Sequence, residues 1–370
     1  MLTGYPAARI VAEAVVYHFV EHPPELAAAR PAVTDLESLI DLAFWASLLR
    51  EELNTPRVSL AFMPPSEGTA LLFAGSIPLT APALTKLAPA VERPGLHLGV
   101  WRDDTASGYC IWGVSRTVPP LSLVIEVVAP GLIVVKHSRI DAAKYANLAV
   151  LEGNRIRILD HDAPMAPNCP ADLLALLRFD LTQTGDSGGI LVDLAASMRQ
   201  HGRGGSLLLV PARNQTWRES IVLPVAYSVS PPFAKIASLM GMNEQQREAR
   251  DWARSLDRTI QTIAGLTMVD GATLISENYD VLAFGAKITR RDGQPQVQQL
   301  LVTEPVIGNR PVIMHPGEIG GTRHMSAAQF VQDQPDAIAL VASQDGRFTV
   351  FAWSGCDGMV QAHRVESMLL

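Results

Sequence analysis

With 370 residues, 48% of them hydrophobic and 18% charged, the chain can bury a large core and is not an intrinsically disordered protein. A formal net charge of −7 argues against a broad basic surface for duplex nucleic acid. The three cysteines (Cys110, Cys169 and Cys356) are too few and too far apart for a disulfide scaffold or paired zinc ligands. We find no signal peptide or membrane-spanning run, and we expect a cytoplasmic protein.

The first part of the chain predicts a β-rich α+β domain over residues 1–175. Apolar spacing indicates a helix over 7–20 and a second helix that ends near Leu53. Thr34 and Glu37 match a capping box at the start of this second helix. Short Val- and Ile-rich runs then predict strands at 58–63, 70–74, 97–101, 110–114, 121–128, 132–135 and 156–159.

A local basic stretch follows the predicted strand at 132–135. It contains Lys136, His137, Arg139 and Lys144. A solvated sheet edge explains such a stretch, and it is also the best candidate in this half for contact with an anionic partner.

Three prolines within residues 163–170 predict a linker, after which the pattern changes to alternating helices and strands. We therefore predict a second domain over 176–370, an α/β domain with a mixed sheet flanked by helices. The predicted helices are 190–199, 243–266 and 326–331. The predicted strands are 206–210, 221–225, 267–269, 273–275, 281–284, 298–303, 337–342 and 348–353.

Two polar clusters of this domain carry possible chemistry. Asp270-Gly271-Ala272 places a carboxylate and a glycine directly before a predicted strand, where a ligand could approach the backbone closely. Gly320-Gly321-Thr322-Arg323-His324 combines backbone N–H groups, a hydroxyl and a guanidinium that could converge on one phosphate. Taken singly, each cluster is also explained by a glycine turn.

Together the two clusters resemble the diadenylate cyclase domain, which is marked by an Asp-Gly-Ala motif and a Gly-Thr-Arg-His-Arg motif. Segments 201–211, 255–272, 281–288 and 333–342 are similar to the strands and the helix that flank these motifs in that family. The resemblance covers about residues 187–353. The layout of the whole chain, a β-rich half before a degenerate cyclase-like half, looks most like the sensor group called DACNV.

The resemblance implies roles for individual residues. Asp270 would bind Mg²⁺ or Mn²⁺, with Asp345, and would act with Arg323 in catalysis. An ATP-type nucleotide would contact Gly271, Ala272, Ile288, Gly321, Thr322, Arg323, His324 and Ser343. In that family two ATP-loaded domains face each other and form cyclic di-AMP by in-line phosphoryl transfer, so a homodimer is implied.

Two departures from the family pattern leave two functions open. The second arginine of the motif is Met325 here, and the Ser-Glu-Glu turn of the family is Ser343-Gln344-Asp345. Loss of a fixed cation removes charge stabilisation of the transition state. We therefore expect a sensor of a nucleotide or cyclic dinucleotide, in a bacterial signalling or conflict system, with a downstream effector protein. The alternative is an active diadenylate cyclase.

Two other motifs are set aside. Gly185-Asp186-Ser187-Gly188-Gly189 copies the nucleophile motif of trypsin-like proteases, but a helical pattern follows it and no histidine lies in a recognisable base motif. The glycine-rich 202–205 precedes a strand, whereas a phosphate-binding loop follows a strand and opens a helix.

Overall fold

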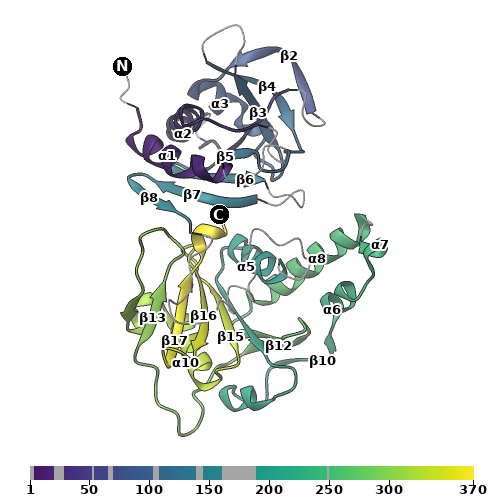
Figure 1. Ribbon diagram of the computed structural model, residues 1–370. Helices are drawn as coiled ribbons and strands as arrows, with labels where there is room; N and C mark the ends of the chain where they lie inside the picture. Colours follow the sequence, from purple (N-terminus) through teal and green to yellow (C-terminus); the bar gives the residue numbers. More distant parts are fainter. Residues whose placement is uncertain are drawn as a thin grey trace. The chain divides into compact units, whose positions relative to one another are not determined.

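The computed structural model describes residues 4–20, 29–51, 54–65, 70–102, 108–138, 145–160, 189–247 and 250–370. The chain divides into two compact units, unit 1 (residues 1–160 with Leu370) and unit 2 (residues 161–369). Both combine helices with a mixed sheet, which confirms the predicted α+β fold (Figure 1). The predicted boundary at 175/176, the linker 163–170, and Cys169 and Ser187 lie outside the described residues.

Unit 1 is an eight-stranded sheet with helices on one face, counted over its described residues. The helical elements are α1 (Pro6–Val20), α2 (Val33–Leu48), α3 (Ala81–Leu87) and the 3-10 turn η1 (Ala88–Ala90). The strands are β1 (Val58–Phe62), β2 (Ala70–Pro78), β3 (His97–Arg102), β4 (Tyr109–Ser115), β5 (Leu123–Ala129), β6 (Leu132–Ser138), β7 (Tyr145–Glu152) and β8 (Arg155–Ile158). Their order is β2-β4-β3-β1-β5-β6-β7-β8, and only the β1–β3 pair is parallel among these neighbours. Strand β7 is absent from the prediction.

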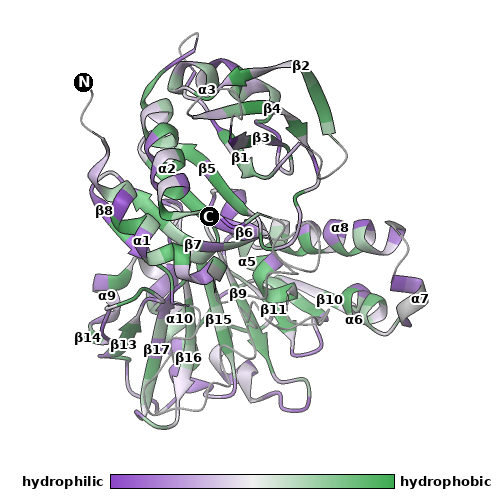
Figure 2. Ribbon diagram, turned by 45° about the horizontal axis from the view of Figure 1, so that its top comes forward, coloured by the Kyte–Doolittle hydropathy of each residue, from purple (hydrophilic) through white to green (hydrophobic). Residues whose placement is uncertain are grey.

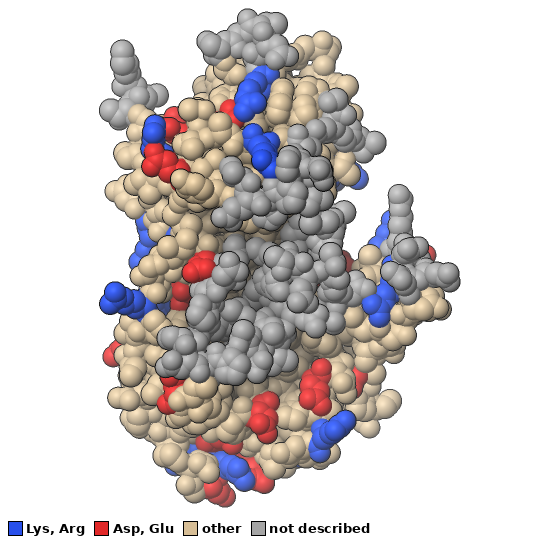
Figure 3. Space-filling view, in the orientation of Figure 1, with Lys and Arg blue, Asp and Glu red and all other residues tan. Residues whose placement is uncertain are grey.

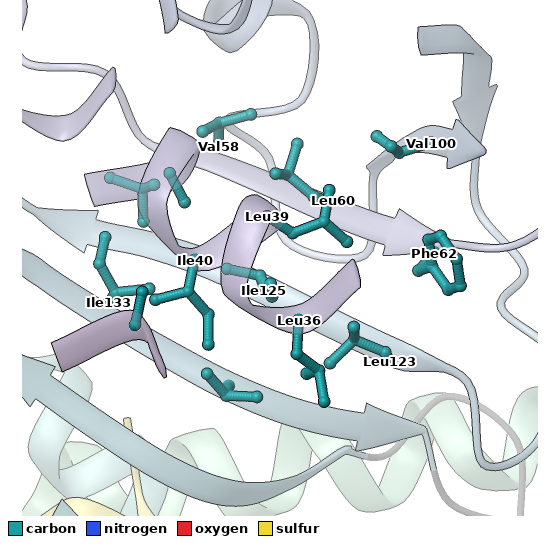
Figure 4. Close-up of a cluster of buried hydrophobic side chains, with 14 of the residues drawn as sticks. Leu36, Leu39, Ile40, Val58, Leu60, Phe62, Val100, Leu123, Ile125 and Ile133 are labelled. Atoms are coloured by element: carbon teal, nitrogen blue, oxygen red, sulfur yellow. The ribbon is translucent and has the colours of Figure 1, made fainter. Parts of the chain in front are cut away.

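The core of unit 1 follows from the two periodicities of its sequence. Leu36, Leu39 and Ile40 recur at helical spacing along α2 and are all buried. Alternate residues of the strands, such as Leu60 of β1 and Ile125 of β5, meet them from the sheet (Figure 4). This packing fixes α2 on one face of the sheet.

The start of α2 differs from the prediction. The helix begins at Val33, so the N-cap is Ala32 and the third helical residue is Asp35. The Asp35 carboxylate accepts a hydrogen bond from the Ala32 N–H at 2.7 Å. Asp35 also accepts from Tyr109 at 2.8 Å and forms an ion pair with Arg102. The prediction of a capping box from Thr34 and Glu37 is therefore wrong. The carboxylate of Asp35 caps the helix instead, and the same carboxylate is bound by Arg102 of β3 and Tyr109 of β4.

The described residues of the basic stretch, Lys136 and His137, lie within β6 and do not form a solvated edge. Lys136 and His137 are buried, and the Lys136 ammonium lies 2.5 Å from the carboxylate of Glu126 on the neighbouring strand β5. Arg139 and Lys144 lie outside the described residues. The part of the stretch that can be placed is thus internal to unit 1 and is not available to an anionic partner.

Unit 2 is a nine-stranded sheet between helices, again over the residues described. The helical elements are α5 (Ile190–Gln200), α6 (Lys235–Met240), α7 (Glu244–Arg247), α8 (Arg250–Leu266), α9 (Pro316–Ile319), α10 (Thr322–Asp333), η2 (Thr216–Ser220) and η3 (Glu366–Met368). The strands are β9 (Gly205–Val210), β10 (Tyr227–Phe233), β11 (Ala272–Ser276), β12 (Val281–Ala286), β13 (Leu300–Thr303), β14 (Val312–Met314), β15 (Ile338–Ala342), β16 (Phe348–Ser354) and β17 (Met359–Arg364). Their order is β10-β12-β11-β9-β15-β16-β17-β13-β14.

Side chains of the central strand β9 point alternately to the two faces of the sheet, and helices cover both faces, so unit 2 has three layers. Leu207 and Leu209 belong to the core shared with α5 and α8, whereas Leu208 and Val210 belong to the core shared with α10. Hydrophobic colour runs along β9 and β15 in Figure 2, as expected for strands covered on both faces. The predicted mixed sheet flanked by helices is confirmed.

Three local predictions for unit 2 are wrong. Residues 221–225 form no strand beyond an isolated bridge at Ile221, and residues 267–269 are a turn that ends α8. In this turn Thr267 is buried and Met268 is exposed, and so short an apolar run cannot be told from a strand by composition. The helix predicted at 326–331 begins four residues earlier, at Thr322.

The face shown in Figure 3 has no large patch of charge of one sign among the residues that are described there. Acidic and basic side chains of unit 2 are interspersed there. Among the described helices, none is long and apolar enough to cross a membrane.

We expect Asp35→Ala to lower the free energy of unfolding by about 2–4 kcal/mol, because it removes the helix cap and leaves Arg102 and Tyr109 without their acceptor. Glu37→Ala is the matched control, with an expected loss below about 0.5 kcal/mol. Urea denaturation measures both. Equal losses for the two variants would contradict the assignment of the cap to Asp35.

Acid should destabilise unit 1 through His97. Its ring nitrogens contact Ser59 Oγ at 2.8 Å and Tyr145 Oη at 2.7 Å, and burial lowers the pKa of His97 from 6.5 to about 4. The unfolded chain takes up this proton near pH 6.5, so stability is lost as the pH falls from 6.5 towards 4. Between pH 7 and pH 5 we expect His97 to account for about 2 kcal/mol. His97→Gln should remove that part of the pH dependence of unfolding, and the exposed His315→Gln should not.

Candidate functional site

The order and direction of the strands bring the two polar clusters to one edge of the unit 2 sheet. Strands β9 and β11 are parallel and therefore start at the same edge, with Ser206 opposite Ala272. Strands β12 and β15 are antiparallel to them and end there, with Ala286 opposite Ala272 and Ala342 opposite Gly205. We call this edge the β9–β11 edge. It collects Asp270 and Gly271, the residues after Ala286, and the turn that starts at Ser343.

Asp270 lies at the surface of this edge. Its carboxylate forms an ion pair with Lys287, whose Nζ lies 2.5 Å from Oδ2. The hydrogen bond from Lys287, together with its charge and that of Arg323, lowers the pKa of Asp270. The carboxylate is thus ionised, close to two cations and accessible to a ligand.

Gly271 is required by the backbone around it. Its φ of +117° favours glycine, and a Cβ there would lie 2.5 Å from the carbonyl carbon of Gly285 on β12. Ala272, the next residue, is 1% exposed and packs in the core beneath. The Gly-Ala pair is therefore explained by the close packing of β11 against β12. The same packing fixes the position of the neighbouring residue Asp270 at the edge.

The second cluster forms the start of α10. Gly321 is the N-cap and Thr322 and Arg323 are the first helical residues, so their N–H groups are among those without a partner in the helix. Gly320 is needed because a Cβ there would lie 2.4 Å from His324 Nδ1. His324 itself is buried against Phe351, and burial lowers its pKa. Its ring therefore sits in the core and Thr322 at the surface.

Arg323 connects the two clusters. Its side chain is half-buried, and its Nη1 lies 3.1 Å from the position that a Cβ on Gly204 would occupy. Gly204, with φ of +70°, precedes β9 and also lies against Gln344. Arg323 thus reaches the start of β9 and acts on Asp270, so a guanidinium, free helix N–H groups and a carboxylate share one edge.

The turn after β15 carries the remaining predicted residues. The Ser343 N–H donates to the Arg347 carbonyl at 2.9 Å, which closes the turn. Asp345 forms an ion pair with Arg347 at 3.2 Å, and a hydrogen bond from Ser343 is the main cause of its lowered pKa. Across the described residues, no group of three or more His, Cys, Asp and Glu side chains could hold a metal ion.

Ile288 lies beside a cavity of about 310 Å³ that adjoins the edge. Its walls include Ile288 and Val297 on one side and Met325 with Ser326 of α10 on the other. The residues that follow Lys287 and Arg323 along the chain therefore form the walls. Met325, where the cyclase motif has an arginine, adds an apolar side chain to a lining that also includes the polar Arg290, Gln296 and Gln329.

The sequence predicted no role for Lys287 in the site, and the glycine-rich segment that contains Gly204 was set aside. Lys287 is the residue after Ala286, the antiparallel partner of Ala272, and this pairing is what places it beside Asp270. The glycine-rich 202–205 precedes a strand as predicted, yet Gly204 leaves the space that the Arg323 side chain uses. Both signals depend on strand pairing, which is not visible in a linear motif.

Comparison with known families bears on unit 1. Residues 25–116 match the family model described as "Probable sensor domain DACNV". The resemblance to the DACNV group is confirmed. The resemblance to DACNV was drawn from the layout of the whole chain, whereas the match lies upstream of the two clusters and includes strands β1 to β4. Residues 25–116 of unit 1 are thus similar to this family, and the residues of the β9–β11 edge come later in the sequence.

Comparisons with single proteins add little. The search of curated proteins gave no match. Among solved structures, a hypothetical membrane spanning protein from Bacillus cereus aligns at 15% identity over 52% of this chain and 68% of its own, with a TM-score of 0.29. A double mutant of DacA from Staphylococcus aureus aligns at 12% identity over 52% of this chain and 89% of its own, with a TM-score of 0.25. Both TM-scores are low, so neither structure informs the fold or the site.

The two glycines of the site should differ in their effect on stability. Gly271→Ala would push a Cβ into the backbone of β12 at a positive φ, and we expect it to lower the free energy of unfolding by about 2 kcal/mol or more. Gly321→Ala meets nothing within 4 Å, and we expect about 1 kcal/mol or less. Thermal and urea unfolding compare them, and an equally benign Gly271→Ala would contradict the packing described.

Proposed function

We propose that unit 2 binds an adenine nucleotide or a cyclic dinucleotide at the β9–β11 edge. The observation that carries this is the position of Arg323, between Gly204 and Asp270 and at the open N-terminus of α10. A half-buried guanidinium beside free N–H groups is suited to phosphate oxygens. The adjoining cavity has an apolar wall at Ile288 and Met325 that suits the flat face of a base.

We propose further that this binding serves sensing in a bacterial signalling or conflict system, in the cytoplasm, where adenine nucleotides are abundant. Two features favour sensing over catalysis. Residues 25–116 match a probable sensor domain, and the cyclase motif lacks its second arginine at Met325. The liganded state would then be passed to an effector protein.

The alternative is an active diadenylate cyclase, and one observation favours it. Asp270, the residue that the cyclase resemblance makes catalytic, is 89% exposed and open to an incoming ribose hydroxyl. That reading needs two nucleotide-loaded copies face to face, with Mg²⁺ or Mn²⁺ at Asp270 and Asp345 as the resemblance implies. It predicts a homodimer and a cyclic product.

Isothermal titration calorimetry of the full chain with ATP tests the site. We expect Arg323→Ala to weaken binding by about tenfold or more, because a charge-assisted pair to phosphate is lost. Arg254→Ala, a change of an exposed arginine on α8, is the control and should leave the affinity unchanged. Unaltered ATP affinity in Arg323→Ala would contradict the proposed site.

Product analysis separates the two functions. The full chain is incubated with ATP and Mg²⁺ or Mn²⁺, and cyclic dinucleotide is sought by chromatography. The sensor proposal expects ATP to bind and to be recovered unchanged. Steady formation of cyclic di-AMP that depends on Asp270 would replace the sensor proposal with the enzymatic one.

A further inference from the structure

The two carboxylates that the cyclase resemblance assigns to a metal ion are both already paired with cations. Lys287 Nζ lies 2.5 Å from Asp270, and Arg347 Nε lies 3.2 Å from Asp345. Arg323 adds a further positive charge near Asp270. Each carboxylate therefore faces a built-in counter-ion.

The charges of the edge do not fit a divalent cation. Around His324 one carboxylate, that of Asp345, is outnumbered by the cations of Arg323, Arg347 and Arg364, and Arg347 also acts directly on Asp345. At nucleotide sites Mg²⁺ is held by one or two carboxylates together with phosphate oxygens and water, so its binding depends on the negative charge that those carboxylates have available. Asp270 and Asp345 share their negative charge with Lys287 and Arg347, and no group of three or more His, Cys, Asp and Glu side chains in the described part of unit 2 could hold a metal ion.

The position of Lys287 is set by rigid parts of the fold. The pairing of Ala272 with Ala286 holds the residues on either side of them together at the edge. The close contact of Gly271 with Gly285 tightens this pairing further. The Lys287 ammonium has three N–H donors, so it can keep its contact with Asp270 and still donate to a phosphate oxygen.

We propose that the β9–β11 edge binds its phosphate ligand without a divalent metal ion, and that Lys287 supplies the positive charge that a metal would bring. This inference depends on the proposed function, because it concerns the same nucleotide site. It assigns the ligand a class: a nucleotide whose phosphates are held by Lys287, Arg323 and the α10 N–H groups alone.

Titration of the full chain with ATP, in EDTA and in excess MgCl₂ or MnCl₂, tests the proposal. We expect the wild-type chain to bind ATP in EDTA at least as tightly as with either metal, since free ATP carries more negative charge. Lys287→Ala should weaken binding in EDTA by about tenfold or more. Lys287→Arg should retain most of the affinity, and Lys235→Ala, a change of an exposed lysine on α6, is the matched control.

The outcomes separate this inference from the proposed function. ATP binding that appears only with Mg²⁺ or Mn²⁺ would overturn the inference and leave nucleotide binding in place. Unchanged affinity of Lys287→Ala in EDTA would overturn the role of Lys287. No ATP binding in any of these buffers would overturn the proposed function and the inference with it. Unfolding curves of Lys287→Ala and Lys235→Ala should coincide, since both lysines are exposed, and this shows that any loss comes from the site.

Discussion

The parallel pairing of β9 with β11 is the constraint on which the site depends. Because Ser206 lies opposite Ala272, both strands start at one edge, and the antiparallel neighbours β12 and β15 end there. The pairing of β11 with β12 brings Lys287 beside Asp270, and the pairing of β9 with β11 brings Gly204, which Arg323 approaches, to the same edge. A shift of one residue would turn each strand's side chains to the opposite face and separate these groups.

The residues of the two polar clusters have two roles: some pack in the core, and others present polar groups at the surface. Gly271 and Gly320 are glycines because a backbone and a buried imidazole occupy the space of a Cβ. Ala272 and His324 are core residues. Asp270, Thr322 and Arg323 are the groups left at or near the surface, where they can reach a ligand. The packing of these residues therefore explains most of the motif, and only a small number of its polar groups are free to reach a ligand.

Much of the fold could be predicted from periodicity. The spacing of Leu36, Leu39 and Ile40 predicts α2, and the runs at 206–210 and 337–342 predict buried strands. The prediction failed where local composition misleads, as in the turn at 267–269. It also failed where a partner is remote: the choice of Asp35 as the cap depends on Arg102, and the role of Lys287 depends on β11 pairing with β12. Both clusters were found from the sequence, whereas the counter-ions that surround them were not.

We propose that a nucleotide binds at the β9–β11 edge of unit 2. Hydrogen–deuterium exchange of the full chain with and without ATP tests it most directly, because backbone N–H groups carry much of the site. We expect ATP to protect segments 203–206, 270–273, 321–326 and 343–346. Protection confined to unit 1, or to the cavity near Trp217 and Asp336 at the other ends of β9 and β15, would contradict it.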